Sequence, residues 1–444
     1  MESGLIYHTQ VPGNTGMGKT EYVARRLAIS DKLTFLGKEE NSTFIPVYLP
    51  DAERIYNTFV MGSRESGRDE IVFSMIAQDI IKGYGACMFD PRQDDDFIER
   101  LVRFLKSKGL ISKFHYFNMG NPDNSQRYNP FAKGSPDEVS RRIVFALDED
   151  NSSEAILFFS NIITIFRLIH SETTVSELIL FVEMFTNQNI LFPNIPADSN
   201  VDVLSLMEEC RTLYNSKIAS IVEKLSAIFT YQGNQKYNPL SLMDGSCDID
   251  ISTIIANGGI VYFGLPLMKY SVLSKTISKM IAFDIMLSMN HRASNANQSN
   301  FYPLYINEPF SFFGNSLERL LLQTRVSNIG ITISFDSFSG LSGLVPEFRN
   351  VLLNNFINSI ILNQNDTAYV QDVSVFLGTN SKEVDVTSLH NNQTRRIQVE
   401  EFNIHPNLIN NSSTLHGVAK IRGLSDPIRV QYSAFPDDTI NNKE

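Results

Sequence analysis

Two glycine-bounded loops in this 444-residue chain have the spacing of a phosphate-binding loop. The first, Gly13–Thr20, reads GNTGMGKT and matches the pattern G-x-x-x-x-G-K-[ST] at every position. In that pattern backbone amides surround the phosphate oxygens, the lysine reaches the β- and γ-phosphates, and the hydroxyl binds Mg²⁺. The match predicts a nucleotide site whose ligands are Gly13, Gly18, Lys19 and Thr20.

The second loop, Gly62–Asp69, reads GSRESGRD and keeps the two glycines, Gly62 and Gly67, without the other ligands. Arg68 stands where the phosphate-binding lysine belongs, and its planar guanidinium does not fit a cradle built for ammonium. Asp69 stands where the hydroxyl belongs and places a negative charge near any phosphate. The sequence therefore predicts a degenerate nucleotide loop.

The elements around the two loops favour the opposite choice. An apolar strand, Thr58–Met61, precedes the second loop, and a helix over Asp69–Lys82 follows it. The first loop follows the weak strand His8–Pro12, with a proline directly beside the loop. Two interpretations of Gly13–Thr20 stay open: a working nucleotide site, or a glycine-rich N-terminal arm.

Strands and helices alternate from residue 58 onward, which predicts a parallel sheet with helices on both faces. Ligands of such sheets bind at the carboxyl ends of the strands, where the second loop and Asp90 both lie. The expected strands are Thr58–Met61, Ala86–Asp90, Lys113–Phe117, Gly259–Pro266, Phe301–Ile306, Gly330–Phe335, Asn358–Leu362, Gly417–Ile421 and Ile428–Ser433.

Helical periodicity replaces this alternation over about residues 135–235 and predicts an all-helical insertion. One long helical stretch is expected from Val201 through Ala219 and on to Tyr231, and another helix over Leu317–Arg325. The predicted division is residues 1–50 (N-terminal arm), 51–134 (first part of the α/β domain), 135–245 (all-helical insertion), 246–436 (second part of the α/β domain) and 437–444 (tail).

Composition narrows the class of protein. The formal net charge of −11 gives no overall attraction to DNA or to anionic membranes, although a local basic patch is compatible with it. The three cysteines have no C-x-x-C pairing, so we expect no zinc site and a reducing compartment. No apolar run is long enough to span a bilayer and no signal peptide is recognised, so we expect a cytoplasmic protein.

Eight motifs in order make the chain resemble the type IV secretion coupling-protein family, the TraD/TraG/DotL-like members of the FtsK/HerA-type hexameric ATPases. The resemblance covers about residues 31–435. The motifs are Leu33–Gly37, Asp51–Gly67, Phe89–Arg92, Tyr128–Phe131 (YNPF), Val261–Pro266, Leu304–Glu308, Gln323–Arg325 and Ser334–Ser337. The family fold is a RecA-like P-loop sheet with an inserted all-helical domain, so this α/β class is what the resemblance implies.

The resemblance assigns roles to four further residues. Glu308 matches the catalytic glutamate, and Arg325 lies in a segment that can face a neighbouring subunit. Asn307 replaces the Walker B aspartate that helps to hold Mg²⁺, and Asp336 replaces the sensor glutamine. Because four chemical positions have changed while the frame persists, we interpret the second loop as a pseudo-ATPase site.

Three hypotheses follow for the activity. The first is a pseudo-ATPase with a structural or cargo-docking role, working beside secretion-apparatus subunits or an active paralogue in one hexameric ring. The second is an active ATP-driven motor that moves DNA or protein and uses Gly13–Thr20 with ATP and Mg²⁺. The third is a regulator that binds nucleotide without hydrolysing it. The family usually carries a membrane anchor, so partners at the inner membrane are expected to recruit this chain.

Overall fold

The computed structural model describes most of the chain. The described residues are 32–40, 45–149, 152–170, 174–186, 202–230, 238–245, 247–294, 300–314, 316–342, 344, 346–364, 368–387 and 394–435. They fall into two compact units: unit 1 comprises described residues within 1–86, 300–310 and 328–444, and unit 2 those within 87–299 and 311–327. Among the described residues, no helix has the length and apolar character needed to span a membrane.

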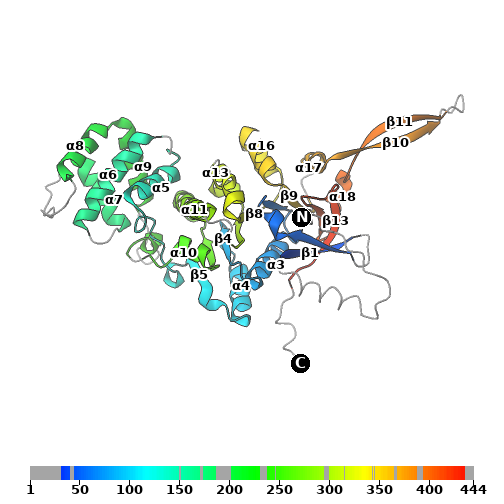
Figure 1. Ribbon diagram of the computed structural model, residues 1–444, viewed down its shortest axis with the longest axis horizontal. Helices are drawn as coiled ribbons and strands as arrows, with labels where there is room; N and C mark the ends of the chain where they lie inside the picture. Colours follow the sequence, from blue (N-terminus) through cyan, green and yellow to red (C-terminus); the bar gives the residue numbers. More distant parts are fainter. Residues whose placement is uncertain are drawn as a thin grey trace. The chain divides into compact units, whose positions relative to one another are not determined.

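Unit 1 is built on eight strands in the order β2-β1-β13-β12-β9-β3-β8-β7 (Figure 1). Strands β9, β3, β8 and β7 pair in parallel, and the strands from β2 to β9 pair antiparallel. The bounds are β1 Leu33–Glu39, β2 Pro46–Pro50, β3 Thr58–Met61, β7 Tyr302–Asn307, β8 Ile329–Phe335, β9 Asn358–Leu362, β12 His416–Lys420 and β13 Ile428–Tyr432.

The parallel strands of unit 1 are buried along their whole length, because helices cover both faces of such sheets. Every residue of β3, β8 and β9 is buried. Met61 of β3 lies opposite Phe335 of β8, and Asn307 of β7 lies opposite Ser334 of β8. The carboxyl ends of β3, β7 and β8 therefore meet at one edge.

The remaining elements of unit 1 are helices and a separate hairpin. The helices are α2 Asp51–Arg54, α3 Arg68–Ile81, α15 Ser339–Ser342, α16 Pro346–Asn355, α17 Val370–Leu377 and α18 Pro406–Asn410, with α12 Pro309–Phe312 following β7. Strands β10 (Thr379–Thr387) and β11 (Thr394–Phe402) pair antiparallel as a two-stranded ribbon. Glu383 and Glu400 are among its exposed residues.

Unit 2 contains three strands in the order β4-β6-β5, of which β5 and β6 pair in parallel. The strands are β4 Ala86–Asp90, β5 Phe114–Asn118 and β6 Ile260–Gly264, and the accompanying helices are α4 Asp95–Ser107, α10 Ile251–Ala256, α11 Ser271–Ala293, α13 Ser316–Leu322 and α14 Thr324–Ser327. Short 3₁₀ turns lie at Ile111–Lys113, Pro122–Asn124 and Pro239–Leu242.

A group of five helices within unit 2 follows the YNPF turn. They are α5 Pro136–Ala146, α6 Ser153–Ile169, α7 Val175–Thr186, α8 Val203–Leu213 and α9 Ser216–Ile228. Helix α6 is central and contacts the other four. Its buried side chains include Phe158 and Phe166, whose rings meet aromatic rings of α7. Ser135 starts α5 through a capping box with Glu138, which satisfies amides at the helix start.

The structure corrects three sequence predictions of local structure. Residues 33–50, assigned to an N-terminal arm, contain β1 and β2, and β1 pairs with β13. The long helical stretch expected from Val201 is two helices, because Asn215 breaks it and caps α9 by accepting the amides of Lys217 and Ile218. The helix expected over Leu317–Arg325 is divided into α13 and α14.

Candidate functional site

The Gly62–Gly67 loop connects β3 to α3 as predicted, and both glycines are required by the space available. A Cβ on Gly62 would lie 2.3 Å from the Ser66 hydroxyl oxygen. Gly67 caps α3 with φ +94°, and a Cβ there would lie 2.6 Å from the Leu415 side chain. The loop is therefore closely packed by its own residues and by the segment that carries Leu415.

Several amides of this loop donate to protein carbonyls. The Gly62 amide donates to the Phe335 carbonyl at 3.2 Å, and the Ser63 amide to the Asn363 carbonyl at 2.9 Å. The Ser66 amide donates to the Ser63 carbonyl at 3.1 Å. Three amides of the loop are thus engaged within the chain in this conformation.

A second segment, residues 411–415, holds the loop from outside. The Leu415 amide donates to the Ser66 carbonyl at 2.9 Å, and the Thr414 hydroxyl donates to the Glu65 carbonyl at 3.1 Å. Leu415 has φ +62° and its own carbonyl accepts from the Tyr432 amide at 2.7 Å. This segment links the loop to β13, far along the chain.

Arg68, the first residue of α3, turns its guanidinium toward the strand ends. Its Nη1 lies 2.5 Å from an Asp336 carboxylate oxygen, 3.3 Å from one of Glu308 and 3.5 Å from the Gly62 carbonyl oxygen. Its Nε lies 3.4 Å from the Asp69 carboxylate. The Arg68 side chain is 5% exposed, whereas that of Asp336 is 67% exposed. One buried cation therefore faces three carboxylates.

The two residues that end β7 are held by β8. The Asn307 side-chain oxygen accepts from the Ser334 hydroxyl at 3.0 Å. Glu308 has φ +50°, an uncommon value for a residue with a side chain, and its amide donates to the Ser334 carbonyl at 2.8 Å. The structure thus brings Arg68, Asp69, Asn307, Glu308 and Asp336 to one strand edge, as the sequence predicted.

A second charged group in unit 1 was not predicted from sequence. Arg54 is fully enclosed and binds Asp79 through two hydrogen bonds, at 2.5 and 2.7 Å. Lys82 binds Asp51 at 2.9 Å, and Tyr305 donates to Asp79 at 2.5 Å. The one sequence signal was Asp79 itself, a carboxylate within the otherwise apolar second half of α3.

The charges of this group balance, and the pKa shifts follow burial. Burial alone would lower the pKa of Arg54, but Asp79, Tyr305 and Asp51 raise it well above its usual value. Burial lowers the pKa of Lys82, although the same carboxylates partly oppose this. Burial raises the pKa of Tyr305, so its hydroxyl remains a donor. The group has the character of a structural core.

In unit 2, the predicted strand-end residue Asp90 is engaged within its own turn. Its carboxylate accepts the amides of Arg92 and Asp94, both at 2.9 Å, and the Tyr262 hydroxyl at 2.7 Å. Among the described residues, no group of histidine, cysteine, aspartate or glutamate side chains has the arrangement of a metal site.

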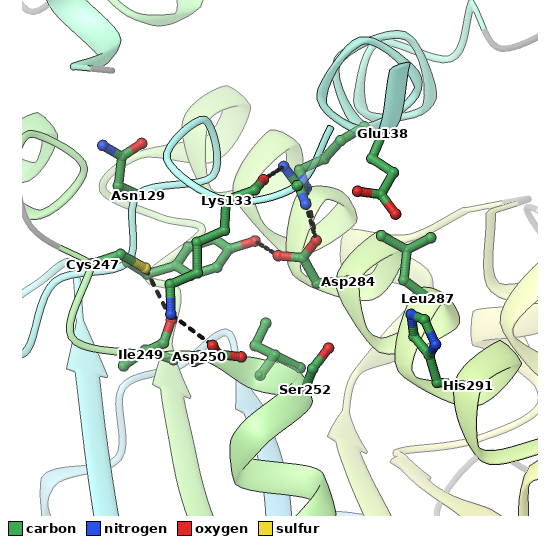
Figure 2. Close-up of a pocket in the computed structure, with 14 residues that line it drawn as sticks. Asn129, Lys133, Glu138, Cys247, Ile249, Asp250, Ser252, Asp284, Leu287 and His291 are labelled. Carbon is green, nitrogen blue, oxygen red and sulfur yellow. Dashed lines mark hydrogen bonds and ion pairs between the residues drawn. The ribbon is translucent and has the colours of Figure 1, made fainter. Parts of the chain in front are cut away.

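A polar pocket of about 220 Å³ lies in unit 2 beneath the YNPF turn (Figure 2). On its floor Asp284 of α11 accepts from the Tyr128 hydroxyl at 2.6 Å and from Arg142 Nε at 2.7 Å. At its rim Lys133 pairs with Asp250 at 2.6 Å. Burial raises the pKa of the Asp284 carboxyl, and Arg142 and Tyr128 offset this only in part.

The remaining candidates lie elsewhere. Arg325 is an exposed residue of α14 in unit 2, whereas Glu308 belongs to unit 1. The complete phosphate-loop pattern, with Gly13, Gly18, Lys19 and Thr20, lies outside the described residues.

Comparison with known proteins places this architecture among RecA-like P-loop proteins. No protein-family model matches the sequence, and no curated protein matches it at a significant level. Sixty solved chains match the structure. The likeness to those described below shows a RecA-like sheet with an inserted helical domain, which confirms the predicted fold class.

The particular neighbours are conjugation and secretion motors. The conjugative coupling protein TrwBΔN70, unbound, matches with a TM-score of 0.63 and 15% identity over 93% of this chain and 92% of its own. TrwB in complex with ADP and Mg²⁺ matches with 0.61 and 17% identity over 88% of each chain. VirB4 of Thermoanaerobacter pseudethanolicus matches with 0.55 and 11% identity over 91% and 97%.

Proposed function

We propose that this protein is a coupling-protein-like subunit of a type IV secretion or conjugation apparatus that hydrolyses no ATP at the Gly62–Asp69 loop. Its role is structural or cargo-docking. The fold shared with TrwB and VirB4 supports the apparatus. The observation that carries the pseudo-ATPase assignment is the Arg68 guanidinium, buried at the strand ends and 2.5 Å from Asp336.

The residues present at this loop do not fit a Mg²⁺-bound triphosphate. P-loop motors use a lysine on the phosphates, and a hydroxyl and an aspartate on the metal. Arg68, Asp69 and Asn307 stand at those three positions. The surrounding carboxylates exceed the guanidinium by two negative charges, which opposes a polyphosphate. Three loop amides donate to protein carbonyls instead.

The proposed role depends on partners. Residues 51–134 and 246–436 would form the motor-like domain, and residues 135–245 the inserted domain that receives DNA or protein cargo. A hexameric ring with an active paralogue at the inner membrane gives Arg325 a function, because an exposed arginine can reach a neighbour's site. Arginine fingers raise phosphoryl-transfer rates by roughly 10³–10⁵.

Nucleotide titration of the purified chain tests the proposal. Calorimetry with Mg²⁺-ATP up to about 1 mM, the upper end of ordinary KM values, is expected to show no saturable binding. Mixing the chain with an active motor of the same apparatus is expected to raise that motor's ATPase rate, and Arg325→Ala is expected to remove the increase. Stoichiometric binding that disappears in Lys19→Ala would overturn the proposal.

The second candidate is an ATP-driven translocation motor that uses Gly13–Thr20. One observation favours it: the pattern there is complete, including Lys19 and Thr20. ATP and Mg²⁺ would then be its cofactors, and Glu308 the residue that orients the attacking water. ATP hydrolysis by the isolated chain, lost in both Lys19→Ala and Glu308→Gln, is the result that this candidate requires.

A further inference from the structure

Arg68 connects three elements of unit 1 at one strand edge. It is the first residue of α3, while Glu308 and Asp336 follow β7 and β8. The parallel register of β7 and β8 places both acidic residues at the same edge. A single side chain therefore bridges the start of a helix and the ends of two strands.

The bridge is short and enclosed. Nη1 of Arg68 contacts Asp336 at 2.5 Å, Glu308 at 3.3 Å and the Gly62 carbonyl at 3.5 Å. The side chain is 5% exposed, so water competes little for the guanidinium. The planar guanidinium presents five donors, which lets one cation serve several oxygens at once.

Nucleotide-dependent motors join these elements through phosphate and Mg²⁺, and their switch segments move when that link is made or lost. Here the link is part of the chain. We infer that Arg68 is a permanent internal substitute for nucleotide, which holds α3 and the ends of β7 and β8 in one arrangement that ATP neither forms nor releases. This inference rests on the proposed pseudo-ATPase function.

The backbone supplies reporters of the arrangement. The Gly62 amide donates to Phe335, the Ser66 amide to Ser63, and the Glu308 amide to Ser334. If Arg68 holds the strand ends together, its removal raises the opening rate of these bonds, and hydrogen exchange measures such local opening.

The experiment is hydrogen-exchange mass spectrometry on the full chain, with and without Mg²⁺-ATP. It compares the wild type with Arg68→Gln, with Asp336→Asn, and with Arg64→Gln, an exposed arginine of the same loop, as the matched control. Arg68→Gln is expected to speed exchange in peptides covering 62–70 and 305–310 by about three- to tenfold, as the loss of a link worth roughly 1 kcal/mol allows. Arg64→Gln is expected to change neither peptide.

Asp336→Asn keeps the test decisive if Arg68→Gln fails to fold, because Asp336 is 67% exposed and its side-chain shape is conserved. It is expected to speed exchange in the same peptides by a smaller factor. Unchanged exchange in the variants that fold would overturn the inference.

The outcomes for the two proposals differ. ATP binding that requires Lys19 but leaves both peptides unchanged would overturn the proposed function and support the internal link. ATP-dependent protection of residues 62–70 in the wild type would overturn both. Absence of any ATP effect, with unchanged exchange in Arg68→Gln, would overturn the internal link alone.

Discussion

Arg54 and Arg68 both bind carboxylates within unit 1, yet their surroundings differ. Arg54 and Lys82 balance Asp51 and Asp79 in a group with side chains at most 8% exposed. Arg68 faces three carboxylates, and Asp336 among them is 67% exposed. A balanced, enclosed group is typical of structural support, whereas an excess of acid at a strand edge indicates a remodelled ligand site.

The largest effect is expected from Arg54→Met. It leaves Asp79 and Asp51 enclosed with Lys82 alone, and breaking a buried ion pair costs about 3–5 kcal/mol. The measurement is the free energy of unfolding from urea titration. Arg422→Gln is the control, because Arg422 is 42% exposed in its pair with Glu53 and should cost no more than about 1 kcal/mol. Equal losses in the two variants would remove the distinction between enclosed and exposed networks.

Gly67→Ala tests whether packing, and not Arg68 alone, fixes the loop. The new methyl group would meet Leu415 at 2.6 Å and occupy φ +94°, so a loss of about 1–3 kcal/mol is expected. Gly83→Ala is the matched control, since Gly83 has φ +79° with open space around it. The difference between the variants in thermal unfolding measures the contact with Leu415; no difference would mean that the loop yields.

Asp284 provides a third case, enclosed but incompletely compensated. Burial raises the pKa of its carboxyl in the folded state, so the folded protein binds this proton more tightly than the unfolded chain. Its contribution is greatest below the ordinary carboxyl pKa of about 4 and is lost as the pH rises through the raised value. Asp284→Asn should remove this dependence, which unfolding titrations of both proteins from pH 4 to 8 would measure. Identical pH profiles would contradict it.

The smallest effect is expected from salt. Raising the ionic strength from about 0.05 to 0.5 M shortens the screening length to a few ångströms and weakens exposed pairs first. The stability difference between wild type and Asp336→Asn should shrink by a few tenths of a kcal/mol. The difference between wild type and Arg54→Met should stay constant; a parallel decline would place both networks in solvent.

Much of the fold was predictable because its signals are local. The apolar strand Thr58–Met61, the glycine-bounded loop and the helix that follows are adjacent in sequence, and the structure confirms them with α3 starting one residue earlier. Strands β1 and β2 were missed because their pairing with β13 joins residues about 390 positions apart. Asn215 did carry a local signal, since asparagine favours helix starts.

The site was predictable to the level of the strand edge. Periodicity alone places Gly62, Glu308 and Asp336 after parallel strands, and such ends meet. That Arg68 turns onto Asp336 depends on the register of β3 with β8 and on a side-chain rotamer, neither of which a sequence pattern specifies. The Arg54 group depends on contacts between segments as distant as Asp51 and Tyr305.

Strand β2 stands last in the strand order of unit 1, and it begins and ends with proline, at Pro46 and Pro50. Proline has no amide hydrogen, so this margin lacks a donor at both ends of the strand. An incoming strand would find a template only three residues long. The two prolines thus protect the sheet from edge-to-edge polymerisation, a hazard for a protein that concentrates in a crowded assembly.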